Sequence, residues 1–549
     1  ILVEIMGKNA FISYDVNTKT YHIHNIFTNF LQEIMEKKDA NYKKNLYEKA
    51  GHWYMKTGEY LASMYYFHAA GDFESLLQVV ELDKANSFGN EQKELLIKYF
   101  EECPEENKQH HPVALLIYAL CLMTFNEMEL LEKVCGEFVM LMQSSSLHPD
   151  RINSLMGEFE LLLSFTSYND IIGMSEHIKK ACALLKEPSV FMDTRGSWTF
   201  GSPSVLYMFY RESGKLEKEV QEIKEAMPYY YQLTNGHGMG AEYVMEAEEY
   251  FNKGDFENTE IAVYKALYRA SSGLQPNIVI CALFLQVRLT LIKGDYAHAL
   301  HLFKKMYEEV EQNKVYELIH TIEMCAGFMN ACLQQKGKIP EWLAEGDFNS
   351  NRLLFPARAF SNIIYGRVLL IKGEYLKLLG IAEQFIGIAS VFSNLLASIY
   401  TTIYIAAANE RIYREGEAIQ AMKEALDIAM PDKVYIPFVE NCDYIKPLLE
   451  KLYSQGIYRK DITRILEMYK LYQKSMEQIR REHFKEDKPK LSEREMEIAR
   501  LAAEGFSNKR IGEKQFISQN TVKTQLKSVF EKLGINSRSL LKQYFIEKY

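Results

Sequence analysis

A three-residue junction recurs along the middle of this 549-residue chain and constrains its fold more than any other feature. Each copy is a Gly, an acidic residue and an aromatic residue. The copies begin at Gly58, Gly71, Gly254, Gly294 and Gly373. In such a junction the Gly ends one helix in a left-handed cap, the acid caps the next helix, and the ring packs between the two. The pattern therefore predicts a series of helix hairpins.

The spacing of the junctions predicts that these hairpins stack. Gly254 and Gly294 are 40 residues apart, and Gly373 follows after 79 more, close to two such steps. A period of this length is typical of an α-helical solenoid, in which each hairpin buries its apolar face against its neighbours. The units resemble tetratricopeptide repeats, best between Ala247 and Ala266. We expect an all-α chain whose helical-repeat domain occupies residues 41–472.

The function of such an array is open, because helical solenoids present a long concave surface that serves sensors and scaffolds alike. Two Gly-rich segments, 192–204 and 234–241, interrupt the repeats. If they form an effector pocket, Arg195, Trp198 and His237 would offer a polar ligand a cation, a stacking surface and a hydrogen-bonding ring. The alternative is that both segments are ordinary long loops between helices.

The C-terminal segment carries the signals of three short helices in close succession. Ser492, with Glu495 three residues later, forms a capping box, and Gly505 supplies a left-handed helix end. Ser507 and Ser518 are the expected N-caps of the second and third helices. The third helix has an apolar stripe made of Val522, Leu526, Val529 and Leu533.

The opposite face of the third expected helix is rich in short polar and basic side chains. They are Asn520, Thr521, Lys523, Thr524, Lys527 and Ser528. Such groups suit the major groove of DNA, where phosphates take the charge and base edges the hydrogen bonds. Residues 488–549 hold 13 Lys/Arg and 7 Asp/Glu, a net charge of +6 in a chain of net charge −9. A basic terminal module on an acidic body is typical of a nucleic-acid reader.

This segment resembles the LuxR-type helix-turn-helix domain. The motifs that carry the resemblance are Ser507-Asn508-Lys509, residues 517–524 (ISQNTVKT) and Lys532-Leu533-Gly534. The resemblance implies base and groove contacts from Lys523, Thr524 and Lys527. It implies DNA-backbone contacts near Asn508, Lys509, Ser518 and Thr521. It also implies a fourth helix after Asn536 that pairs in dimers, so we expect residues 491–549 to form the DNA-binding domain.

The sequence departs from the LuxR-type pattern at several positions. They are Arg510, Gly512, Gln515 and Gln525. Gly512 within a helix costs about 1 kcal/mol relative to Ala. We therefore expect a domain of reduced stability that still folds.

The first forty residues predict a different piece of structure. Residues 11–15 and 21–24 read as two short strands around a turn, followed by a helix from Asn25 to about Met35. This piece resembles the end of the winged helix in MalT-like regulators of the STAND class, and a charged linker at 473–490 completes the same domain order. The resemblance implies an ATP- or ADP-binding domain upstream of Ile1, with His24 touching a nucleotide phosphate. The alternative for His24 is a helix-start histidine packed in a small core.

Several classes of site have no support in the sequence. No GxxxxGK[ST] motif and no local arrangement of a nucleophile with its base occurs. The eight cysteines form no CxxC pair, and the paired histidines lack further ligands at metal-binding spacing. The longest apolar run, 113–125, is too short to cross a bilayer. We therefore expect a cytoplasmic protein that is not an enzyme and holds no metal or cofactor in this chain.

Together these patterns favour a transcription regulator that binds double-stranded DNA as a homodimer and contacts RNA polymerase. Its repeats would sense a small molecule or a protein, which the sequence does not identify. A second reading is a protein-protein scaffold whose helix-turn-helix has decayed. A third, compatible with the first, is the regulatory half of an ATPase switch. Sequence-specific binding in a gel shift separates the first reading from the second.

Overall fold

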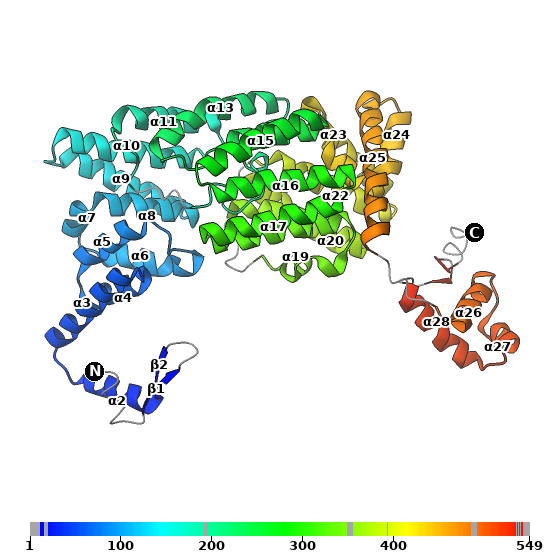
Figure 1. The fold of residues 1–549 in the computed structure, drawn as a ribbon, viewed down its shortest axis with the longest axis horizontal. Helices are drawn as coiled ribbons and strands as arrows, with labels where there is room; N and C mark the ends of the chain where they lie inside the picture. The colour runs from blue at the N-terminus through cyan, green and yellow to red at the C-terminus, as the bar shows by residue number, and fades with distance from the viewer. Residues whose placement is uncertain are drawn as a thin grey trace. The chain divides into compact units, whose positions relative to one another are not determined.

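The computed structural model (Figure 1) describes residues 11–15, 20–190, 196–348, 355–391, 393–484, 491–533, 535, 537–538 and 540–541. The chain divides into two compact units, Ile1–Ser475 and Met476–Tyr549. The described elements are α-helices, apart from one two-stranded sheet and short 3-10 turns. The chain is therefore all-α, as predicted.

The N-terminal elements are the hairpin and helix that the sequence predicts. Strand β1 (Ile12–Asp15) pairs antiparallel with β2 (Thr20–Ile23), and α2 spans Asn25–Glu36. Ile12 is buried, whereas Ile26 and Phe30 are more than half exposed. The rings of Phe11 and Phe27 stack at 6.1 Å. Assignment of this piece to a winged helix stays a prediction.

The repeat region begins with helices of 4 to 18 residues. They are α3 (Ala40–Thr57), α4 (Tyr60–Ala70), α5 (Phe73–Asp83), α6 (Lys93–Glu102), α7 (Glu105–His110), α8 (Pro112–Thr124), α9 (Met128–Ser144), α10 (Pro149–Thr166), α11 (Ile171–Leu184), α12 (Leu206–Phe209) and α13 (Leu216–Leu233). Neighbours in sequence pack together, as α3 does on α4 and α10 on α11.

The second part of the repeat region continues the same arrangement. Its helices are α14 (Ala241–Lys253), α15 (Phe256–Ser272), α16 (Pro276–Lys293), α17 (Tyr296–Asn313), α18 (Ile319–Cys332), α19 (Glu341–Glu345), α20 (Arg358–Lys372), α21 (Tyr375–Val391), α22 (Leu395–Arg411), α23 (Glu415–Ala429), α24 (Ile436–Ser454) and α25 (Arg459–His483). Helix pairs α14 and α15, α16 and α17, and α20 and α21 are in contact. The junctions at Gly254, Gly294 and Gly373 join these pairs, as predicted. Helices α22 and α23 also pair, although no such junction joins them.

The Gly-acid-aromatic junctions have the predicted geometry where the acid is Asp. All five glycines have φ between 69° and 78°. Asp72, Asp255 and Asp295 each accept a hydrogen bond from the backbone N–H three residues later, at 3.1, 3.2 and 2.9 Å. Glu59 makes no such side-chain bond. Its extra methylene moves the carboxylate away from the position that a short N-cap side chain occupies.

Segments far apart in sequence meet inside the repeat region. Helix α12 contacts α22, and α14 contacts α24. Leu395 N donates to Tyr210 O at 3.0 Å, and Tyr435 N donates to Asn252 O at 2.8 Å. Tyr210 OH donates to Asp432 Oδ2 at 2.7 Å. Helices far apart in sequence therefore pack directly on one another here, which the spacing of the junctions does not predict.

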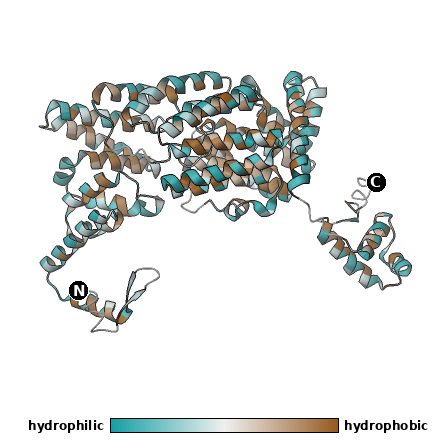
Figure 2. Ribbon diagram, in the orientation of Figure 1, coloured by the Kyte–Doolittle hydropathy of each residue, from teal (hydrophilic) through white to brown (hydrophobic). Residues whose placement is uncertain are grey.

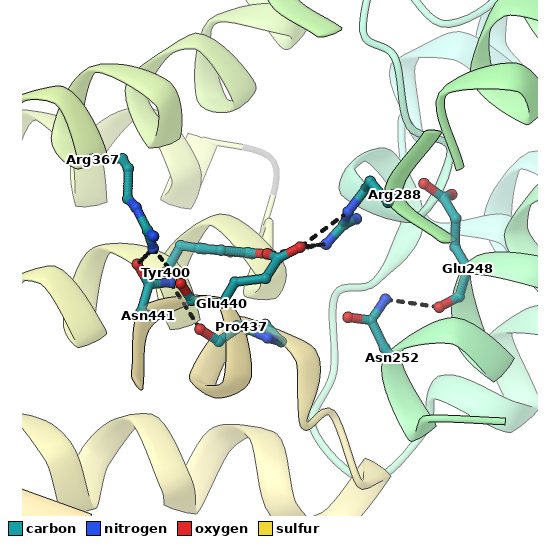
Figure 3. A network of polar contacts seen from close by, with 8 residues as sticks. All are labelled: Glu248, Asn252, Arg288, Arg367, Tyr400, Pro437, Glu440 and Asn441. Carbon is teal, nitrogen blue, oxygen red and sulfur yellow. Dashed lines mark hydrogen bonds and ion pairs between the residues drawn. The ribbon is translucent and has the colours of Figure 1, made fainter. Parts of the chain in front are cut away.

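A buried ionic network ties four of these helices together (Figure 3). Arg288 of α16 donates through Nη2 to Glu440 Oε1 of α24 at 3.0 Å. Tyr400 of α22 donates to Glu440 Oε2 at 2.5 Å. Arg367 of α20 donates through Nη1 to Glu440 O at 2.5 Å and to the Asn441 side chain. Because an unpaired buried charge is costly, these contacts oppose separation of the four helices.

Helix α16 is long and apolar enough to cross a membrane by length and composition, and 78% of that window is buried inside the protein. It packs on α14, α15 and α17, and the ribbons of this part of the chain carry both hydrophilic and hydrophobic residues (Figure 2). No other helix of the described ranges meets the same test. The sequence-based search for long apolar runs missed α16 because Gln286 and Arg288 interrupt it.

A helix occupies the N-terminal part of the linker that the sequence predicts at residues 473–490. Helix α25 continues to His483, and Met476 and Ile479 are buried. Its apolar residues keep a helical spacing beyond residue 473, so the charges there lie on a helix. Residues 485–490 fall outside the described residues. The C-terminal unit then contains α26 (Glu493–Ala503), α27 (Asn508–Gln515) and α28 (Gln519–Leu533).

Candidate functional site

The three C-terminal helices pack around a small apolar core. Its buried members are Ile498, Ala499, Ala502, Ile511, Val522, Leu526, Val529 and Leu541. Three of these, Val522, Leu526 and Val529, form the stripe that the sequence predicts on α28. Since each of the three helices contacts the other two, the core fixes the orientation of α28.

Local capping sets where these helices begin. Ser492 Oγ accepts from Glu495 N at 3.2 Å, and Glu495 Oε2 accepts from Ser492 N at 2.9 Å, which completes the predicted capping box. Ser507 Oγ accepts from Arg510 N at 3.4 Å. Ser518 Oγ accepts from Thr521 N at 3.1 Å. The Ser residues named as N-caps from sequence therefore all cap their helices.

The turn between α27 and α28 is tight. Phe516 ends α27 in the left-handed region with φ 55°, and its side chain is 95% exposed. A Cβ added to Gly512 would lie 2.6 Å from Ile517 O, well inside van der Waals contact. The Gly that departs from the LuxR-type pattern therefore permits the close approach of the turn to α27.

One face of α28 is exposed and polar. Asn520, Thr521, Lys523, Thr524 and Lys527 all lie on it with exposed side chains. Thr524 Oγ1 donates to Asn520 O at 3.1 Å, which leaves its methyl group and oxygen lone pairs for other contacts. A short helix with two ammonium groups, an amide and two hydroxyls can contact both phosphates and base edges in a major groove.

Two residues assigned to DNA from sequence differ in their surroundings. Lys509 is exposed at the start of α27, whereas Asn508 is half-buried and its Oδ1 accepts from Arg538. Ser528 does not share the exposed face, because its Oγ donates to Glu495 Oε1 of α26 at 2.8 Å. Ser528 lies in the C-terminal half of α28, where Lys532 also contacts Glu495 of α26.

Glu495 is the most strongly perturbed acid of this unit. Lys532 Nζ donates to its two carboxylate oxygens at 2.7 Å each. The bond to Lys532, aided by those from Ser492 and Ser528, lowers the pKa of Glu495 to about 2. The sequence predicts Glu495 only as a capping residue. Its contacts with Ser528 and Lys532, more than thirty residues away, have no local signature.

Residues 489–545 match the family described as bacterial regulatory proteins, luxR family (GerE). Over 58 residues the chain is 43% identical to the oxygen regulatory protein NreC of Staphylococcus aureus strains JH9 and JH1. The C-terminal unit contains a LuxR-type DNA-binding domain. The matched segment is 11% of this chain and spans 27% of the length of these curated relatives. The likeness to NreC thus concerns the LuxR-type domain.

The two Gly-rich segments meet in the repeat unit. Trp198 lies against Gly238, where an added Cβ would be 2.5 Å from the indole ring. His237 Nε2 lies 3.0 Å from Gly196 O. Trp198 and His237 also line a cavity of 360 Å³. Arg195, the third residue expected there, lies outside the described residues.

The polar groups of this wall bond to one another. Gly196 O can only accept, so His237 Nε2 carries the proton and His237 Nδ1 accepts from Tyr230 OH at 2.9 Å. Trp198, which has only a donor, hydrogen-bonds the Tyr230 oxygen. Both His237 nitrogens are thus engaged within the protein. The expectation that His237 offers its ring to a polar ligand does not fit this arrangement.

His24 caps α2. Its Nδ1 accepts from Ile26 N at 3.2 Å, and the side chain is exposed. The ring makes an edge contact with Phe11 at 6.1 Å between centroids. The position at the helix start agrees with the sequence prediction, whereas packing of His24 in a small core does not occur. Its proposed contact with a nucleotide stays a prediction.

Proposed function

We propose that this protein is a transcription regulator that reads double-stranded DNA through α28. The observation that carries the proposal is the exposed polar face of α28, held by a LuxR-type core on its other side. The net charge of +6 over residues 488–549 supports attraction to phosphates. The similarity of this domain to that of the oxygen regulatory protein NreC supports a role in regulation.

The proposal assigns sensing to the repeat unit and catalysis to no part of this chain. A regulator needs an input, and the cavity beside Trp198 is a candidate place for one. No cluster of His, Cys, Asp or Glu suited to a metal occurs among the described residues. On the LuxR-type resemblance, the protein would act in the cytoplasm, bind DNA as a homodimer and contact RNA polymerase. On the MalT-like resemblance, a STAND-class ATPase domain would cooperate with it.

The decisive test is a gel shift of the whole chain against a pool of random duplexes, followed by sequencing of the bound fraction. We expect enrichment of a defined site. The Lys523→Ala/Lys527→Ala variant should bind that site at least tenfold more weakly, with a salt slope reduced by about 0.9 per lost phosphate contact. Arg494→Ala/Arg500→Ala, on the exposed side of α26, is the control with the same charge change. No enrichment, or equal loss in both variants, would favour the scaffold reading.

A further inference from the structure

The cavity beside the Gly-rich segments is large and opens to the surface, because Thr124 and Met128 of its lining are exposed. Its 360 Å³ are lined by α8, α10, α11, α13 and the segment that follows Gly196, among other residues. Small-molecule sites start at about 300 Å³, and a cavity of about 150 Å³ already admits benzene. The space is sufficient for a molecule of about two fused rings.

The lining of this cavity is chemically distinctive because it is flexible and apolar. Methionines come from five helices, α8, α9, α11, α12 and α13, at Met123, Met128, Met174, Met208 and Met227. Unbranched thioether side chains adapt to irregular ligands and make favourable contacts with aromatic rings. Phe165, Phe200, Phe209 and Trp198 add ring surfaces. Such a wall favours a hydrocarbon body.

Charge is almost absent from the described part of the lining. Lys84 is the only Lys, Arg, Asp or Glu among the described residues that line it, and it is half-buried at the end of α5. No carboxylate of the described part of the chain lines the cavity. A cationic ligand would therefore lose its hydration without gaining a partner.

The hydrogen bonds within the wall of the cavity are a second, independent reason to expect an apolar ligand. Trp198, Tyr230 and His237 bond in series and end on Gly196 O. A polar ligand that sought these groups would have to break protein hydrogen bonds to make its own. An apolar ligand leaves the series intact and gains ring and methionine contacts.

We propose that this cavity binds a neutral, largely hydrocarbon small molecule, about the size of a fused two-ring aromatic. This inference rests on the proposed function in one respect, namely that the bound molecule acts as the effector of a transcription regulator. This molecule differs from the polar ligand expected from Arg195, Trp198 and His237, of which Arg195 lies outside the described residues. Within the described parts of the two Gly-rich segments, Trp198 supplies a ring surface to the site and His237 bonds to Gly196.

The test uses 1-bromonaphthalene, a neutral probe whose bromine quenches indole fluorescence on contact. The chain has three tryptophans, so Trp53→Phe/Trp342→Phe leaves Trp198 as the single emitter. We expect saturable quenching of Trp198 at micromolar probe. Unchanged or non-saturable Trp198 emission would overturn the proposal. So would equal quenching of Trp53 in the Trp198→Phe/Trp342→Phe chain.

Occupancy of the cavity is tested by filling it from two sides in the single-tryptophan chain. Ala226→Leu on α13 and Thr124→Leu on α8 should each weaken binding at least tenfold. Ala183→Leu, on an exposed part of α11, is the matched control and should change nothing. Circular dichroism establishes that each variant is folded. Full affinity in a folded cavity variant would overturn the proposal.

A competition experiment tests the preference of the site for a neutral ligand over a cation. Protonated 1-naphthylmethylamine should compete with the bromo probe at least tenfold more weakly than naphthalene does. Equal competition would show that the site does not discriminate against a cation, contrary to the proposal. None of these measurements contains DNA. Saturable quenching together with a failed gel shift would support the apolar site but contradict the proposed role in DNA binding. A successful gel shift without saturable quenching would contradict the apolar site alone.

Discussion

Lys532 Nζ donates to both carboxylate oxygens of Glu495 at 2.7 Å, and so links the last turn of α28 to the first turn of α26. The same carboxylate closes the capping box with Ser492. A single side chain therefore fixes the start of one helix and the orientation of the helix expected to read DNA. Glu495 is 6% exposed, whereas Lys532 is 39% exposed.

The first prediction concerns pH. The pKa of Glu495 is lowered to about 2 from an ordinary value of 4.5, chiefly by Lys532. The stabilisation is therefore fully present above pH 4.5 and is lost as the pH falls towards 2. We expect amide hydrogen exchange in α26 and α28 to accelerate over this window. In Glu495→Gln this acceleration between pH 4.5 and 2 should be absent. A pH profile identical to that of the unmodified protein would contradict the role given to Glu495.

The second prediction concerns stability of the LuxR-type domain. Glu495→Ala removes a helix cap and the charge-assisted bonds to Lys532 and Ser528. We expect the free energy of unfolding of the domain to fall by about 2 kcal/mol. Glu497→Ala, exposed on the same helix, is the control and should change it by less than about 0.5 kcal/mol. Urea unfolding followed by exchange of α28 amides measures both.

The third prediction concerns Gly512. Helix propensity alone predicts that Gly512→Ala stabilises α27 by about 1 kcal/mol. The new Cβ would lie 2.6 Å from Ile517 O, a backbone atom that cannot move without opening the turn. We expect net destabilisation and weaker DNA binding, since the start of α28 must shift. A higher unfolding midpoint in the variant would show that the turn relaxes at little cost.

Local sequence signals predicted the helix boundaries because each depends on a few neighbouring residues. The left-handed Gly254, the cap at Asp255 and the box at Ser492 are all visible within four positions. Packing between distant segments has no such signature. Tyr210 and Asp432 are hydrogen-bonded although more than 200 residues separate them, so this packing could not be predicted from a repeat period.

In the candidate sites, too, local features could be predicted from the sequence and tertiary contacts could not. The exposed face of α28 follows from helical periodicity, which is why Asn520, Lys523 and Thr524 lie where the sequence predicts. Ser528 bonds to Glu495 of α26, a tertiary contact that helical periodicity does not predict. The proximity of Trp198 to His237 was anticipated from composition, but the bonding of His237 within the protein depends on tertiary contacts with Gly196 and Tyr230.

The fourth prediction concerns reading of DNA. Thr524 is exposed on α28 and carries no charge, so its methyl and oxygen can meet base edges without adding a phosphate contact. We expect Thr524→Ala to relax preference at one base pair by roughly 1–3 kcal/mol and to leave the salt slope unchanged. Binding to a set of single-base variants of the enriched site measures this. An unchanged preference would remove Thr524 from the residues that read bases.

The last prediction concerns the ionic network of the repeats. Arg288→Met would leave Glu440, 5% exposed, without its cationic partner, although Tyr400 still donates to it. We expect a loss of about 3–5 kcal/mol in the free energy of unfolding of the repeat unit, measured by urea denaturation. Lys293→Met on the same helix breaks an exposed ion pair with Glu260 and should cost less than about 1 kcal/mol. Because the main cost in Arg288→Met is the isolated charge, adding Glu440→Gln should recover part of the loss. If the double variant is less stable than Arg288→Met, the dominant contribution of Arg288 is its packing on Phe251 and Phe328 rather than its charge.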